Sequence, residues 1–254
     1  MKADGQLYLD LMKRTLTNTI YRGVPVAWVE GQPVFDTTRR EHGTPWLNIA
    51  HTMVSVRRLD NLQFCLERAL ADGVPGDFIE TGVWHGGACI FARSLFKAHG
   101  VQDRTVWVAD SFQGVPTTTA GSHPMDQELA LHEKNAMLAV SEETVRENFS
   151  RYELLDEQVS FLSGWFADTL PGAPISQLAV IRLDGDLYSS TMDALEHLYP
   201  KLSPRGYVIV DDYGIPACAT AVHEYREQHG IEDEICFIDP YSIYWRRSTG
   251  SSGW

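Results

Sequence analysis

The stretch Leu178-Ala-Val-Ile-Arg-Leu-Asp-Gly-Asp186 decides the fold, together with Tyr207-Val-Ile-Val-Asp-Asp212 further along the chain. Each stretch begins as a short run rich in Val, Ile and Leu and ends in two carboxylates. Such runs are typical of buried strands in a parallel sheet. Because ligands of parallel sheets bind beyond the carboxyl ends of the strands, we expect these four acids to meet at a functional site.

The same kind of segment recurs on both sides of this pair. Strand patterns occupy 77–80, 105–110, 159–162, 178–184 and 206–211, and helical patterns occupy 88–99, 142–152, 189–202 and 216–229. This alternation predicts an α/β fold with a doubly wound, mostly parallel sheet. Two further strands, 234–238 and 242–246, are joined by too few residues for a parallel crossover, so we expect a seven-stranded sheet that ends in an antiparallel hairpin.

Two helices and a loop precede the alternating part. Leu7, Leu11 and Ile20 predict an amphipathic helix over 7–21, and leucines at helical spacing predict a second helix that begins near Leu59. The intervening residues 22–50, like 113–141, lack periodicity. Long loops at the ligand end of an α/β sheet are usually lids or substrate loops, so we expect that role for both segments.

The chain therefore divides into three predicted regions. We expect an N-terminal helical extension and lid over 1–72 and a catalytic core over 73–247. The low-complexity residues 248–254 are expected to be a disordered or vector-derived tail.

Composition narrows the possible partners. The chain has 254 residues, 44% of them hydrophobic, with a net charge of −13 and a pI near 5.0. This charge argues against binding a nucleic-acid backbone, and no apolar run is long enough for a membrane span. Four cysteines lack metal-binding spacing, so we expect reduced thiols, a cytoplasmic location and no zinc.

A glycine-rich turn follows the first strand of the alternating part, in Phe78-Ile-Glu-Thr-Gly-Val-Trp-His-Gly-Gly87. Its spacing matches neither the dinucleotide fingerprint nor a P-loop, and Glu80 would repel a pyrophosphate. An acid at this position suits the ammonium group of an amino acid. Asp110 ends the next strand and can accept both hydroxyls of a ribose. Together these features favour a nucleoside that carries an amino acid, which describes S-adenosylmethionine.

The four acids after the two strands predict a metal site. Carboxylates crowded in a dry crevice need positive charge to offset their repulsion, and all-oxygen ligands favour a hard divalent cation such as Mg²⁺. The alternative is that each Asp caps the helix that follows it.

Longer motifs carry a family resemblance. Glu80-Thr-Gly82, Asp110 and Asp184 resemble the class I S-adenosylmethionine-dependent methyltransferases. Four sequence motifs resemble the macrocin O-methyltransferase family; they occupy 74–84, 104–114, 183–186 and 210–213. The resemblance covers residues 6–247. This family methylates deoxysugar hydroxyls of macrolide and aminocoumarin antibiotics. The resemblance therefore implies a Mg²⁺- and S-adenosylmethionine-dependent O-methyltransferase that acts on the deoxysugar of a glycosylated antibiotic.

The resemblance also implies roles for individual residues. Asp186 would be the general base, and Asp184, Asp211 and Asp212 would be the metal ligands; the alternative for Asp186 is that it supports the metal ligands or caps a helix. The implied cofactor-binding residues are Met53, Glu80, Thr81, Gly82, Trp84, Gly86, Ala88, Asp110, Ser111, Gly164, Trp165, Phe166, Asp168 and Asp184.

Other functions stay open at this point. A catechol-type or caffeoyl-CoA-type O-methyltransferase has a similar arrangement of metal-binding carboxylates. Such an enzyme usually carries a Lys shortly after the first metal-binding Asp, and no Lys follows Asp184 shortly here. A phosphoryl-transfer or nucleotide-sugar enzyme would need free Arg or Lys near the acids. A binding module without catalysis would not need four clustered carboxylates.

We also expect a homodimer that binds a small glycoside and neither nucleic acid nor membrane. The apolar stripe predicted over 7–21 would be buried between two chains, and two-fold dimers are the commonest soluble assembly. The alternative is a monomer in which this helix packs on its own sheet.

Overall fold

A twisted seven-stranded sheet forms the centre of the computed structural model, which describes residues 3–21 and 50–249. The strand order is β3-β2-β1-β4-β5-β7-β6, and β7 runs antiparallel to both of its neighbours. This arrangement confirms the predicted α/β fold with its terminal hairpin. The strands are β1 (Asp77–Thr81), β2 (Val106–Asp110), β3 (Val159–Ser163), β4 (Leu178–Leu183), β5 (Leu202–Val210), β6 (Cys236–Asp239) and β7 (Ser242–Arg246).

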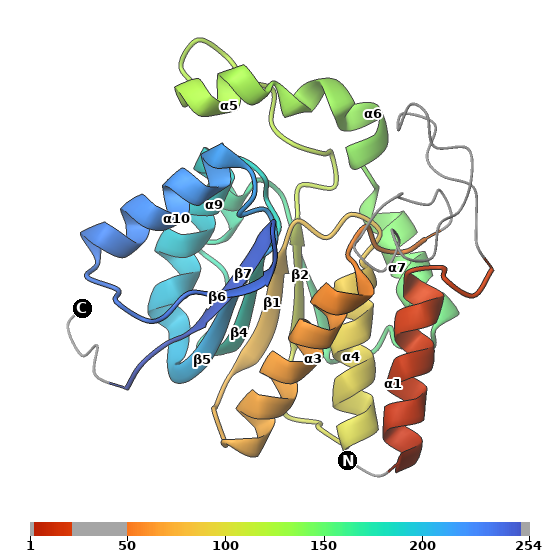
Figure 1. Ribbon diagram of the computed structural model, residues 1–254. Helices are drawn as coiled ribbons and strands as arrows, with labels where there is room; N and C mark the ends of the chain where they lie inside the picture. The colour runs from red at the N-terminus through yellow and green to blue at the C-terminus, as the bar shows by residue number, and fades with distance from the viewer. Residues whose placement is uncertain (1–2, 22–49, 250–254) are drawn as a thin grey trace.

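Helices cover both faces of the sheet (Figure 1). One face carries α1 (Ala3–Leu16), α3 (Val56–Ala71), α4 (Gly87–His99) and α7 (Glu142–Arg151), and the other carries α8 (Phe166–Thr169), α9 (Tyr188–Leu198) and α10 (Pro216–Gln228). Successive strand residues face opposite cores: Phe78 packs with α3 and α4, whereas Ile79 packs with α9. Burial on both faces explains the nearly continuous apolar runs of the central strands.

The first helix differs from its prediction. It ends at Leu16, and it buries Leu9, Met12 and Leu16 against α4. Leu7 and Leu11, which defined the predicted apolar stripe, are 69% and 55% exposed. The helix is amphipathic, but the face that packs on the core is not the face the sequence suggested.

Residues 113–141 also differ from the expected loop. They contain α5 (Pro124–Leu129), a 3₁₀ helix (Leu131–Lys134) and α6 (Asn135–Leu138). Each is too short to show a helical period. Figure 1 shows this segment above the end of the sheet at which the parallel strands finish. The other predicted lid, apart from residue 50, lies outside the described residues, as do 250–254.

The turns after β1 and β4 touch each other directly. Gly82 has φ +85°, and a Cβ there would lie 1.7 Å from the carbonyl oxygen of Asp184. The amide of Asp184 donates to the Thr81 carbonyl at 2.9 Å. These contacts fix the two turns at the point where strand order reverses, which is where open α/β sheets bind ligands.

Within the described ranges, no helix is both long and apolar enough to cross a bilayer.

Candidate functional site

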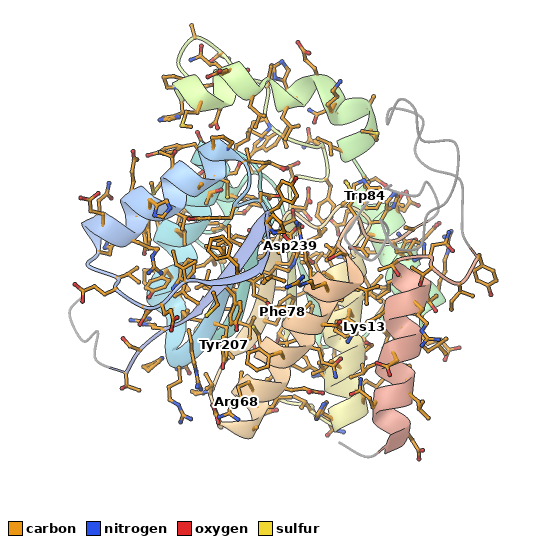
Figure 2. The ribbon with its side chains drawn as sticks, in the orientation of Figure 1. Lys13, Arg68, Phe78, Trp84, Tyr207 and Asp239 are labelled. Atoms are coloured by element: carbon orange, nitrogen blue, oxygen red, sulfur yellow. The ribbon has the colours of Figure 1, made fainter. Side chains whose placement is uncertain are left out.

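A cavity of about 760 Å³ opens at the carboxyl ends of the parallel strands. Its walls are the turns that follow β1 to β5, and Leu131, Lys134 and Leu138 from the segment above the sheet also line it. In Figure 2, Trp84 and Asp239 lie at this upper end of the sheet, whereas Arg68 and Tyr207 lie toward the opposite end. The cavity has the size and position of a small-molecule site.

The strand-end acids meet in this cavity. Carboxylate oxygens of Asp184, Asp211 and Asp212 all lie within 4.8 Å of one another. The backbone amide of Asp186 donates to Oδ2 of Asp212 at 3.1 Å, which holds the two turns together. Three carboxylates at this spacing can coordinate one cation from one side.

A buried arginine already neutralises part of the cluster. The guanidinium of Arg182, 1% exposed, forms ion pairs with Glu80, with Asp184 at 2.6 Å and with Asp211. Glu80 lies opposite Arg182 in the register of β1 and β4. The inference that only a metal could offset the acids is therefore incomplete, because this side chain supplies positive charge from within the sheet.

A second arginine reaches the cluster from α3. Arg58 pairs with Asp211 at 2.5 Å and with Asp239 at 2.7 Å, and its Nη2 also donates to Asp239 at 3.1 Å. Both carboxylate oxygens of Asp211 therefore face guanidinium groups. Because both arginines are already paired with carboxylates, neither matches the free cations expected of a phosphate-binding site.

The two arginines affect the pKa values of the clustered acids unequally. Burial raises the pKa of Asp211, but Arg182 and Arg58 outweigh it and leave the pKa below its usual value. Burial, together with the charges of Asp184 and Asp211, raises the pKa of Asp186 to about 7. Burial and the three neighbouring aspartates raise the pKa of Asp212 well above its usual value. The ionised forms of Asp186 and Asp212 are thus disfavoured by their surroundings, in contrast to that of Asp211.

Glu80 lines the cavity, but its carboxylate is occupied. Its oxygens accept from Arg182 and from the thiol of Cys89, the latter at 2.9 Å. Burial raises its pKa to about 7, since Arg182 offsets the burial only in part. A bound ammonium group would therefore share this carboxylate with Arg182.

Asp110 lines the cavity at the end of β2. Its Oδ2 accepts from the amide of Val83 at 2.7 Å, and its Oδ1 accepts from the amide of Phe112 at 2.8 Å. These hydrogen bonds hold the carboxylate in place beside the cavity. Ser111 also lines the cavity and donates to the Gly114 carbonyl at 2.6 Å.

The structure separates the remaining predicted residues into two groups. Those that line the cavity are Met53, Gly82, Trp84, Gly164, Trp165 and Phe166; those that do not are Thr81, Gly86, Ala88 and Asp168. Asp168 is exposed on α8, and Gly86 precedes the first turn of α4. The sequence motif therefore includes residues that shape the backbone beside the cavity.

Strained backbone marks the same turns. Trp84, Phe112 and Asp186 follow β1, β2 and β4, and their φ angles are +48°, +57° and +57°. Left-handed geometry is unfavourable for residues with a Cβ and is concentrated at functional sites. In this structure the left-handed residues occur in three strand-end turns that line the same cavity.

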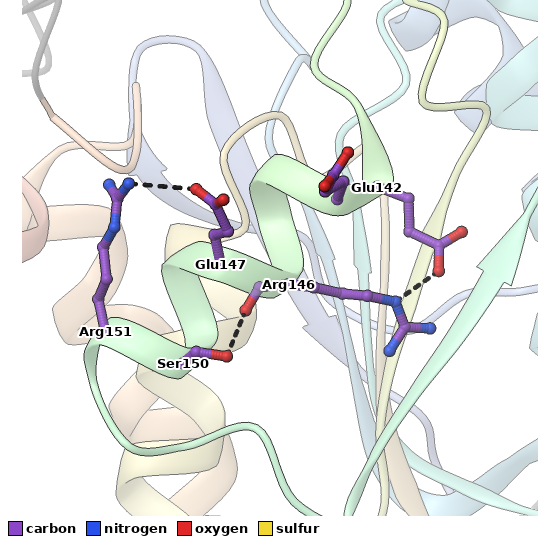
Figure 3. Close-up of a pocket in the computed structure, with 6 residues that line it drawn as sticks. Glu142, Arg146, Glu147, Ser150 and Arg151 are labelled. Carbon is purple, nitrogen blue, oxygen red and sulfur yellow. Dashed lines mark hydrogen bonds and ion pairs between the residues drawn. The ribbon is translucent and has the colours of Figure 1, made fainter.

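A second hollow, on the outer face of α7, lacks these features. Figure 3 shows that its charged groups pair along the helix, Arg146 with Glu142 and Arg151 with Glu147. Both pairs are solvent-exposed, so they contribute little energy. It is an ordinary solvated helix surface.

Three charged residues of the site were missed by the sequence reasoning. Arg182 had a usable signal, since an arginine inside an apolar strand needs a buried partner. Arg58 and Asp239 had none, because their neighbours in the sequence do not distinguish them from surface charges. Only the packing of α3 against the end of β6 reveals them.

Comparison with known proteins agrees with this geometry. Residues 5–247 match the family described as Macrocin-O-methyltransferase (TylF). The 8-demethyl-8-(2,3-dimethoxy-alpha-L-rhamnosyl)-tetracenomycin-C 4'-O-methyltransferase of Streptomyces olivaceus is 58% identical over 248 residues, covering 97% of this chain and 94% of the relative. Mycinamicin III 3''-O-methyltransferase of Micromonospora griseorubida is 58% identical over 246 residues, covering 96% and 97%.

A solved structure extends the comparison to three dimensions. The structure of the O-methyltransferase NovP has a TM-score of 0.93 and 52% identity, covering 96% of this chain and 100% of that chain.

Replacing Arg182 tests its role as the internal counter-charge. Arg182→Met keeps much of the volume but leaves Glu80, Asp184 and Asp211 without their shared partner. We expect the free energy of unfolding, measured by urea titration, to fall by about 3–5 kcal/mol. Arg151→Met, in an exposed pair on α7, should cost less than about 1 kcal/mol. An Arg182→Met protein as stable as the parent would contradict this role.

Proposed function

Because the chain belongs to the macrocin O-methyltransferase family, we propose that it transfers a methyl group from S-adenosylmethionine to a deoxysugar hydroxyl of a glycosylated antibiotic, with Mg²⁺ as the metal. The observation that carries the proposal is the convergence of Asp184, Asp211 and Asp212, with Asp186 beside them, in the part of the cavity over the ends of β4 and β5.

We assign the cofactor to the part of the cavity over β1 and β2. Asp110 would accept the ribose hydroxyls, and Glu80 would face the ammonium group. Trp165 and Phe166 line the neighbouring wall after β3 and offer aromatic surface to the adenine. Gly82, which also lines the cavity, lets this turn contact the Asp184 carbonyl without a side chain between them.

The acidic cluster fits a divalent cation. Asp184, Asp211 and Asp212 supply oxygen ligands, which Mg²⁺ prefers. Burial and like charges raise the pKa values of Asp186 and Asp212, and a bound cation would favour their ionised forms. When bound, the cation supplies Lewis-acid polarisation of the acceptor hydroxyl and lowers its pKa.

Asp186 is the proposed general base. No ion pair to its carboxylate occurs within the described residues, so the group is free to accept a proton. The proposed transfer forms an oxygen–methyl bond at the acceptor hydroxyl and breaks the sulfur–methyl bond of S-adenosylmethionine, and the hydroxyl proton passes to Asp186. The left-handed turn at Asp186 would hold its side chain toward the acceptor.

The cavity also fits a large, amphiphilic acceptor. Val115, Pro116, Leu131 and Leu138 provide apolar surface on the side opposite the acids. The sugar would lie at the acids and the apolar aglycone against these side chains. We propose that the segment 113–140 closes over the acceptor and excludes water.

An acceptor panel tests the proposed function. Purified protein with S-adenosylmethionine and Mg²⁺ should add one methyl group, detected by mass, to a glycosylated macrolide, an aminocoumarin or a rhamnosylated polyketide, but not to the matching aglycone. Chelation with EDTA should abolish turnover and excess Mg²⁺ should restore it. Full activity in EDTA would contradict the metal, and methylation of the aglycone would contradict the sugar as acceptor.

Two amide substitutions separate the proposed roles of the acids. Asp186→Asn should leave Mn²⁺ affinity, measured by calorimetry, nearly unchanged and lower kcat by about 10²–10⁴-fold, as loss of a general base does. Asp212→Asn should instead weaken Mn²⁺ binding, because it replaces a charged ligand with a neutral one. Near-native kcat in Asp186→Asn would place the base elsewhere.

We also propose a homodimer, with exposed Leu7 and Leu11 of α1 at the interface. These side chains are four residues apart on one helix face, and burying them would remove apolar surface from water. Light scattering at micromolar concentration should give twice the 28.5 kDa of one chain, and Leu7→Glu combined with Leu11→Glu should halve that mass. A monomeric mass for the parent protein would contradict the dimer.

We infer a reducing, cytoplasmic location, because all four cysteines are free thiols.

We also propose that the N-terminal extension ends at residue 72 and the core begins at residue 73. This boundary falls in the turn between α3 and β1, although α1 and α3 share one hydrophobic core with α4.

A further inference from the structure

Asp126 of α5 is a buried carboxylate outside the acidic cluster. It is 2% exposed, and its partners are all at the start of α9. Its Oδ1 accepts from the amide of Tyr188 at 2.7 Å, and its Oδ2 accepts from the amide of Ser189 at 3.1 Å and from the Ser189 hydroxyl at 2.7 Å. Three hydrogen bonds thus join two segments that lie more than 60 residues apart.

This arrangement replaces a missing helix cap. The residue before α9 is Leu187, whose side chain cannot accept a hydrogen bond from the first turn. Asp126 satisfies two of the amides that a helix start leaves unpaired, and its negative charge is favourable at that end of the helix dipole. A charged donor–acceptor pair of this kind is stronger than a neutral one.

A ring contact strengthens the junction. His123, at the start of α5, stacks on Tyr188 with ring centroids 3.7 Å apart and an interplanar angle of 8°. The hydroxyl of Tyr188 donates to Glu224 of α10 at 2.6 Å. The first residue of α9 is therefore held between α5 and α10.

The junction connects two parts of the cavity. On one side, Tyr188 and Ser189 follow directly after the turn that carries Asp186, and the amide of Leu187 donates back to Gly185 at 2.5 Å. On the other side, α5 continues into Leu131, Lys134 and Leu138, which line the cavity from above. A rotation of α5 away from α9 would therefore move these cavity-lining residues and, at the same time, release the turn that carries Asp186.

We propose that Asp126 is a positioning residue: it fastens the roof formed by 124–138 to the start of α9 and thereby holds Asp186 in place for the acceptor. The inference rests on the proposed function for the role of Asp186. The coupling of the roof to the turn at Asp186 through the Asp126 carboxylate does not depend on which acceptor binds.

Two variants of Asp126 and one matched control test the coupling. Asp126→Ala removes all three hydrogen bonds. Asp126→Asn keeps one oxygen acceptor but turns an amide toward donors, so it should retain the junction in part. Glu128→Gln changes an exposed charge on the same short helix and should behave as the parent.

Amide hydrogen exchange is the readout that needs no substrate. In Asp126→Ala, exchange should rise together in 130–138 and 185–189, by about tenfold or more, since a lost cap of this strength shifts a local equilibrium by roughly that factor. Asp126→Asn should give an intermediate increase. Faster exchange confined to α5, or no change at all, would overturn the coupling.

Kinetics on a glycoside that the parent protein methylates give the second readout. Asp126→Ala should lower kcat/KM for the acceptor by about 10–100-fold and lower kcat itself, while the affinity for S-adenosylhomocysteine changes less than about threefold. Partial recovery in Asp126→Asn is expected. Unchanged kcat in folded Asp126→Ala protein would overturn the positioning role. If the parent methylates no glycoside, the proposed function fails, and the exchange data still decide the coupling.

Discussion

The ion pairs of Arg182 are the constraint on which the site depends. A guanidinium buried in the central strand joins the ends of β1, β4 and β5 through Glu80, Asp184 and Asp211. A planar group with five donors can satisfy three carboxylates at once, which an ammonium group could not do as rigidly. Without it, these three carboxylates would lose the positive charge that they share within the sheet.

This internal charge divides the acidic cluster into two parts. Arg182 and Arg58 each donate to one oxygen of Asp211, so its carboxylate is held in a fixed position in the site. Asp186 and Asp212 lie away from the arginines, and their pKa values are raised by burial and by neighbouring acids. The two arginines thus position Asp184 and Asp211, whereas Asp186 and Asp212 have no ion pair within the described residues.

The sequence predicted the sheet well because burial on both faces leaves a strong signal: apolar runs, each ended by an acid or glycine. It placed the predicted acids correctly at the strand ends for the same reason. It failed where the signal was weak. In α1, the stripe of Leu7 and Leu11 was as apolar as that of Leu9 and Met12, and only packing on α4 decides which is buried. Arg58 and Asp126 act through contacts distant in sequence, which one sequence cannot reveal.

We propose that the strand-end acids bind a metal ion despite the arginines beside them. Anomalous scattering from crystals grown with Mn²⁺ and S-adenosylhomocysteine tests this metal site directly. We expect one manganese peak within roughly 2.0–2.3 Å of an oxygen from each of Asp184, Asp211 and Asp212. Bound S-adenosylhomocysteine with no manganese peak at these three residues, at millimolar Mn²⁺, would contradict it.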